Sequence, residues 1–170
     1  DGSDHATREV VNAFRSKLNI IHVWHPDVGF RKTEILNATL HHCTSDYVIF
    51  SDGDCIPRND FVATHARFAH PLRFLSGGYH KLPMFTSEQI TEASPQCFDR
   101  RWLKKNGMPS SVKNLKLMVR GQAASILDAL TTTRPTWNGH NASGWRQDLL
   151  NVNGFDTRMR YGGEDRELGE

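Results

Sequence analysis

The stretch that most constrains the fold of this chain runs from Tyr47 to Pro57. Its first four residues are β-branched or aromatic and predict a short buried strand, which ends at an acidic, glycine-containing turn. This turn carries two carboxylates one residue apart, Asp52 and Asp54. Carboxylate oxygens are the ligands that hard divalent cations prefer, so the turn is a candidate site for a metal and a phosphate. Asp-Gly-Asp is also ordinary turn chemistry, and the tripeptide alone leaves a solvated turn as the alternative.

Helical and extended patterns alternate along the first part of the chain. Apolar residues recur at spacings of three and four over residues 6–18 and again over residues 30–43, which predicts two amphipathic helices. Residues 1–4 are expected to form a turn that caps the first helix, and residues 19–24 to form a strand. This alternation is typical of an α/β fold with a mostly parallel central sheet flanked by helices.

The remaining expected elements are shorter: a helix capped by Asn59, strands over residues 72–79 and 134–139, and helices over residues 87–93, 110–130, 145–151 and the end of 161–168. In open α/β sheets, ligands bind beyond the carboxyl ends of the strands, where Asp52 and Asp54 are expected. If the last strand and the Gly162-Gly163 turn return to this edge, Glu164 and Asp165 face the same crevice.

Composition narrows the class of protein. The chain has 170 residues, of which 38% are hydrophobic, and this fits one globular domain that buries roughly 70% of its unfolded surface. Lys and Arg number 21 against 19 Asp and Glu, so charge gives no argument for a nucleic-acid partner. Cys43, Cys55 and Cys97 are too few for a disulfide framework and are interpreted as thiols. No apolar run approaches the roughly 20 residues that span a bilayer.

Four sequence blocks occur in a specific order and spacing: Gly29-Phe30-Arg31 leading to Leu36-Asn37-Ala38, then Tyr47 to Pro57, then Asn138 to Ser143, and finally Gly154-Phe155-Asp156 followed by Gly163-Glu164-Asp165-Arg166-Glu167. Together they resemble the family 2 glycosyltransferases of GT-A (Rossmann-like) fold. The last block resembles the Gly-Gly-Glu-Asp segment of galactosyltransferases, as found in a bacterial group of the family. The resemblance covers the chain except residues 81–134, which are expected to be a variable insertion on the acceptor side.

The resemblance implies an inverting, metal-dependent hexosyltransferase. Such an enzyme moves a sugar from a nucleotide-diphosphate sugar, here a UDP-sugar, to a hydroxyl of a glycan or lipid-linked acceptor. Its expected cofactor is Mn²⁺ or Mg²⁺, and no nucleic acid is expected as a partner. The implied setting is bacterial polysaccharide biosynthesis in the cytoplasm, including the cytoplasmic face of the inner membrane with peripheral membrane association.

The resemblance also implies roles for residues on the donor side. Asp54 matches the metal ligand of the family's Asp-x-Asp motif, and Asp52 matches the residue that reaches the ribose or a metal-bound water. Arg31 lies where the family has a basic residue near the donor phosphates, although a surface ion pair is the alternative for it. Asp1 matches the second Asp of an Asp-Asp-Gly-Ser turn near the nucleobase.

On the acceptor side, Asp165 matches the catalytic base and Glu164 the residue that holds the acceptor sugar. The alternative for both is that they are acidic residues favoured at the start of a helix. Tyr161 is a candidate stacking platform for the acceptor ring. Trp137 and Trp145 are candidates for the same role, with core packing as the alternative.

The family pattern extends beyond both ends of this chain. It includes a strand and helix before Asp1 and a metal-ligating histidine after the Gly-Glu-Asp motif, so the chain is expected to be a fragment with weak activity or none. Two other functions stay open. One is a non-catalytic module of the same fold that binds nucleotide sugars or glycans. The other is a sugar-phosphate nucleotidyltransferase, although the Gly-rich phosphate loop expected of that class is not visible in the sequence.

Overall fold

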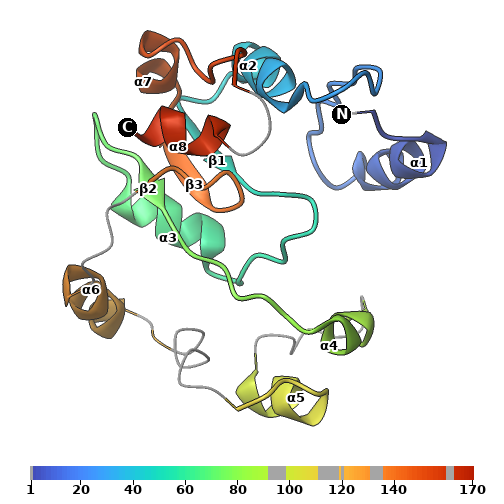
Figure 1. Cartoon of the computed structure of the whole chain (residues 1–170), viewed down its shortest axis with the longest axis vertical. Coiled ribbons are helices and arrows are strands. Elements are labelled where there is room, and N and C mark those ends of the chain that lie inside the picture. Colours follow the sequence, from blue (N-terminus) through green and yellow to red (C-terminus); the bar gives the residue numbers. More distant parts are fainter. Residues whose placement is uncertain (1, 92–98, 111–118, 120, 131–135, 160–162) are drawn as a thin grey trace. The chain divides into compact units, whose positions relative to one another are not determined.

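The computed structural model describes residues 2–91, 99–110, 119, 121–130, 136–159 and 163–170 (Figure 1). The chain divides into two compact units, one made of Asp1–Gly77 with Pro135–Glu170 and the other of Gly78–Arg134. The first unit contains the sheet and, of the residues proposed for the site, the described ones: Arg31, Asp52, Asp54, Glu164 and Asp165. A role of residues 81–134 on the acceptor side stays a prediction.

The sheet has three strands in the order β1-β3-β2 (Figure 1). They are β1 (Tyr47–Phe50), β2 (Leu75–Ser76) and β3 (Ala142–Trp145), and β3 pairs antiparallel with both neighbours. The strands β1 and β2 therefore run in the same direction, as expected for a crossover through a helix, but β3 lies between them and runs against both. The prediction of a mostly parallel central sheet is thus not confirmed, because the central strand of the described sheet, β3, is antiparallel to both of its neighbours.

The predicted strands agree with the structure only in part. Residues 47–50 form β1 as expected, whereas residues 72–79 contain only the two-residue strand β2. Residues 19–24 form no strand, so that prediction was wrong. Of the strand predicted over residues 134–139, the described residues 136–139 form no strand. The strand β3 consists of Ala, Ser, Gly and Trp, of which only Trp favours strands. It was missed because its burial and its two neighbours determine its conformation.

The helices of the described residues are α1 (His5–Phe14), α2 (Lys32–His42), α3 (Phe61–Phe68), α4 (Met84–Glu88), α5 (Arg100–Lys105), α6 (Gly121–Leu130), α7 (Arg146–Asn151) and α8 (Glu164–Gly169). The two long periodic segments, the segment after Asn59 and the segment at residues 145–151 are helical as predicted. Asp4 caps α1, because its Oδ1 accepts a hydrogen bond from the Thr7 backbone N–H at 3.0 Å. None of these helices is long and apolar enough to cross a membrane within the described residues.

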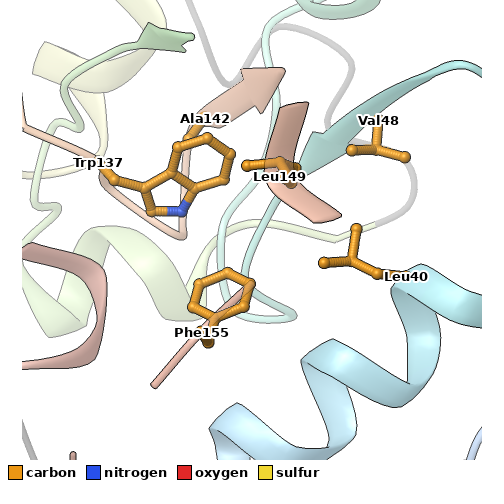
Figure 2. Close-up of a cluster of buried hydrophobic side chains, with 6 residues drawn as sticks. All are labelled: Leu40, Val48, Trp137, Ala142, Leu149 and Phe155. Atoms are coloured by element: carbon orange, nitrogen blue, oxygen red, sulfur yellow. The ribbon is translucent and has the colours of Figure 1, made fainter. Parts of the chain in front are cut away.

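The core of the first unit brings together side chains from distant parts of the chain (Figure 2). Its buried members are Leu40, Val48, Trp137, Ala142, Leu149 and Phe155. Trp137 is only 1% exposed, and the Phe50 ring meets its face at an edge-on angle of 75° with centroids 5.2 Å apart. Trp137 therefore packs in the core, which was the alternative to a stacking role at the acceptor.

The turn after α7 is attached to α2 by one side-chain amide. Asn37 donates through Nδ2 to the Phe155 carbonyl and accepts through Oδ1 from the Phe155 N–H, both at 2.8 Å. The preceding Gly154 has a positive φ of 65°, and a Cβ there would collide with Asn37 Oδ1. Glycine is needed at this position for both reasons, and the close approach holds α2 and residues 154–155 together.

The second unit has buried residues of its own. Leu103 in α5 and the nearby Met108 are buried, and the Met108 N–H donates to the Leu103 carbonyl at 2.9 Å. Asp99 caps α5 by accepting from the backbone N–H groups of Arg101 and Trp102. These local contacts stabilise α5, a short helix that the sequence analysis did not predict.

Candidate functional site

The acidic turn that follows β1 brings three potential ligand groups together. One oxygen each of Asp52 and Asp54 and the sulfur of Cys55 lie within 4.8 Å of one another. The turn is closed by a hydrogen bond from the Cys55 N–H to the Asp52 carbonyl at 3.1 Å. Asp54 is exposed, whereas Asp52 and Cys55 are half-buried. The predicted pair of carboxylates therefore converges in a geometry that could hold a cation.

The thiol of Cys55 is a poor ligand for this purpose. Burial raises the pKa of Cys55, and the neighbouring charges of Asp54 and Asp52 raise it further, so the thiol stays protonated at neutral pH. The oxygen atoms that remain suit Mg²⁺ or Mn²⁺, which bind proteins through one or two carboxylates and take phosphate oxygens and water as their other ligands. The residues present fit the expected metal. Cys43 and Cys55 are free thiols as predicted, and Cys97 lies outside the described residues.

The register of the sheet places a second turn at the same edge. Phe50, the last residue of β1, pairs with Ala142, the first residue of β3. The residues that follow β1 and the residues that precede β3 are therefore at one edge, since the two strands are antiparallel. Before β3 the chain forms a turn over residues 138–141, in which the Asn141 N–H donates to the Asn138 carbonyl at 2.8 Å.

The helix α8 brings Asp165 to this second turn. The Gly139 backbone N–H donates to Asp165 Oδ2 at 3.0 Å, and a Cβ on Gly139 would lie 2.9 Å from Oδ1, so any other residue there would push the carboxylate away. Asp165 Oδ1 is buried and has no hydrogen-bond partner among the described residues. The carboxylate therefore has one oxygen held by the Gly139 N–H, and the other is buried without a hydrogen-bond partner among the described residues.

Glu164, the neighbour of Asp165, has a different environment. It is 6% exposed, and its Oε1 lies 3.7 Å from Lys32 Nζ at the start of α2. This ion pair links α8 to α2. A role of Glu164 in holding an acceptor sugar stays a prediction.

Arg31 immediately precedes α2 and pairs with Glu34 one turn further on. The Arg31 Nε donates to Glu34 Oε2 at 2.9 Å, and this hydrogen bond raises the pKa of Arg31 and lowers the pKa of Glu34. A surface ion pair was the alternative for Arg31, and its phosphate role stays a prediction. Asp1 and Tyr161 lie outside the described residues.

Sequence reasoning missed two residues that hold the acidic helix in place, Gly139 and Lys32. Gly139 is 26 positions from Asp165 in the chain, and no spacing pattern connects the two. The glycine in an Asn-Gly turn does signal a position where something approaches the backbone closely, but it does not say which residue approaches.

The structure is a mixed α/β fold with acidic side chains beyond the end of β1, where open α/β sheets bind their ligands. Comparison with known families adds to this. Residues 1–78 match the family model described as glycosyl transferase family 2, which supports the resemblance to that family found in the sequence. The match supports a glycosyltransferase that uses nucleotide-sugar donors. No curated protein matches the chain significantly.

Proposed function

We propose that this chain carries the catalytic site of an inverting, metal-dependent glycosyltransferase that transfers a sugar from a UDP-sugar to a hydroxyl of a glycan or lipid-linked acceptor. One observation carries the proposal. The turn with Asp52 and Asp54 and the turn that holds Asp165 lie at the same edge of the sheet, through the pairing of Phe50 with Ala142. A donor bound at one turn and an acceptor bound at the other would meet there.

On the donor side, Asp54 and Asp52 would hold the cation. When bound, Mn²⁺ or Mg²⁺ offsets the negative charge that develops on the nucleoside diphosphate as it leaves. Asp54 is exposed and within reach of a ligand, and Asp52 is close enough to share the same cation. Arg31 lies at the start of a helix, where a donor phosphate would compete with Glu34 for its guanidinium.

On the acceptor side, Asp165 would act as the general base. The Gly139 N–H holds Oδ2, and the buried Oδ1 has no partner among the described residues to compete with an acceptor hydroxyl. This oxygen would take the hydroxyl proton while the acceptor oxygen attacks the anomeric carbon. Attack from the face opposite to the leaving group would invert the configuration at that carbon.

The substitution Asp165→Asn tests the proposal in the intact enzyme. An amide keeps an oxygen for the Gly139 N–H but cannot accept a proton, so kcat is expected to fall by about 10²-fold or more while donor affinity stays similar. The matched control is Glu167→Gln, which neutralises an exposed carboxylate in the same helical turn. Turnover of Asp165→Asn equal to that of the wild type would refute the role of Asp165.

Release of UDP from UDP-sugars distinguishes the proposed transferase from a binding module of the same fold. We expect the wild type with Mn²⁺ to release UDP, and to do so faster when an acceptor is present. Metal-dependent UDP binding without release, across a panel of acceptors, would favour the binding module instead.

A further inference from the structure

Four polar side chains of the first unit form one continuous series of hydrogen bonds. Tyr47 Oη and Ser143 Oγ are 2.7 Å apart, and Ser143 Oγ is 2.6 Å from His65 Nδ1. On the other side of the ring, His65 Nε2 is 3.0 Å from Asn141 Oδ1. Ser143 is fully buried and His65 is 6% exposed. The series joins β1, β3 and α3 to the last residue of the turn that holds Asp165.

If the His65 ring is neutral, only one of its two tautomers satisfies every bond in this series. Asn141 Oδ1 can only accept, so the ring carries its proton on Nε2 and donates there. His65 Nδ1 then accepts from the Ser143 hydroxyl, and Ser143 Oγ accepts from the Tyr47 hydroxyl. Burial lowers the pKa of His65, which favours the neutral ring that this arrangement needs. The imidazole therefore works as a neutral bridge between the sheet and the turn.

The Asn138–Asn141 turn is also held by the end of β2. The Gly77 N–H donates to the Asn141 carbonyl at 2.8 Å, and Asn138 Nδ2 donates to Ser76 Oγ at 2.8 Å. A Cβ on Gly77 would collide with the Asn141 side-chain amide. The turn is thus fixed by His65 and by residues 76–77, and its Gly139 N–H is what orients Asp165.

We propose that His65 is a positioning residue for sugar transfer: through Asn141 it holds the Asn138–Asn141 turn where the Gly139 N–H orients the carboxylate of Asp165. This inference rests on the proposed function, in which Asp165 is the base. Because His65 acts on Asp165 through this turn, its loss is expected to lower kcat. The Michaelis constant for the donor, which depends on Asp52 and Asp54, is expected to stay the same.

Two substitutions of His65 distinguish the hydrogen bond to Asn141 from the hydrogen bond to Ser143. In His65→Gln the amide nitrogen reaches about the position of Nε2 and keeps a donor for Asn141, whereas in His65→Asn the shorter amide reaches only the side of Ser143. We expect His65→Gln to keep kcat within about threefold of the wild type and His65→Asn to lower it by about tenfold or more, because small displacements of catalytic groups are costly. The controls are His42→Gln and His42→Asn, at an exposed position in α2.

Two further measurements keep the inference testable if His65→Asn fails to fold. Asn141→Ala removes the same bond from the other side and is expected to give the same loss of kcat. The ¹⁵N chemical shifts of the His65 ring in the wild type are expected to show the neutral form protonated on Nε2. A neutral ring protonated on Nδ1 would overturn the inference.

The outcomes for the inference and for the proposed function differ. Equal loss of kcat in His65→Gln and His65→Asn, or no loss in either, overturns the positioning role while wild-type turnover leaves the transferase intact. A wild type that binds UDP but transfers no sugar to any acceptor overturns the proposed function, and the inference with it.

Discussion

The carboxylates of the candidate site have the same chemistry but different surroundings. Asp54 is exposed beside Asp52, Glu164 is buried against Lys32, and Asp165 has one oxygen on a backbone N–H. An exposed pair can bind a cation from solution, whereas a buried carboxylate needs a partner such as Lys32 to offset its loss of hydration. At the scale of single residues, the surroundings of each carboxylate therefore distinguish Asp54, the candidate metal ligand, from Asp165, the candidate base.

A residue-scale prediction concerns Asp54. We expect Asp54→Asn to abolish Mn²⁺-dependent binding of UDP, because an amide oxygen carries no charge to hold the cation. Isothermal titration calorimetry of the wild type and the variant, with and without Mn²⁺, measures the effect. The control is Asp46→Asn, which removes the same charge at an exposed position before β1. Unchanged calorimetric affinity in Asp54→Asn would contradict the assignment of the metal site.

At the scale of elements, single polar side chains decide how helices and turns are attached. The amide of Asn37 on α2 matches both backbone groups of Phe155, a residue 118 positions away. The sequence placed Asn37 and Phe155 in two separate motifs and had no means of pairing them. The Lys32–Glu164 ion pair attaches α8 to the same helix, so α2 serves as the common support of both C-terminal segments.

An element-scale prediction follows for Asn37. We expect Asn37→Ala to lower the free energy of unfolding by about 2 kcal/mol or more, because it leaves the N–H and the carbonyl of Phe155 without their partner. Urea unfolding at neutral pH, followed by circular dichroism, measures the change. His42→Ala on an exposed position of the same helix is the control and should change stability by no more than about 0.5 kcal/mol. Equal midpoints for the two variants would show that the Asn37 contact is not stabilising.

At the scale of the whole molecule, the first unit is built from two separated parts of the chain, on either side of residues 78–134. Its core joins Leu40 and Val48 from the first part to Trp137 and Phe155 from the second (Figure 2). Removing a core side chain that contacts both parts should therefore destabilise the whole unit, because the surrounding residues only partly fill the cavity that is left.

Trp137 provides the test at this scale. We expect Trp137→Ala to lower the free energy of unfolding by about 3–5 kcal/mol, a large share of the stability of an ordinary domain. Thermal and denaturant unfolding by circular dichroism measure the loss, and Val62→Ala, at a position 65% exposed in α3, is the control. A loss below about 1 kcal/mol would contradict the central place of Trp137 in the core.

Local features of the sequence determined much of the secondary structure. The periodicity of α1 and α2, the cap at Asp4, the strand that forms β1 and the acidic first turn of α8 all depend on neighbours within a few residues. The carboxylates of the candidate site could be named for the same reason, because each lies in a short motif.

Only the tertiary structure decided how these parts meet. The strand β3 has weak propensity and becomes a strand because it lies between β1 and β2, and its antiparallel direction replaces the expected parallel sheet. The contacts of Asp165 with Gly139 and of His65 with Ser143 join residues 26 and 78 positions apart. Periodicity, caps and turns act over a few residues along the backbone, whereas strand pairing and polar contacts of this kind depend on residues that only the folded chain brings within hydrogen-bonding distance.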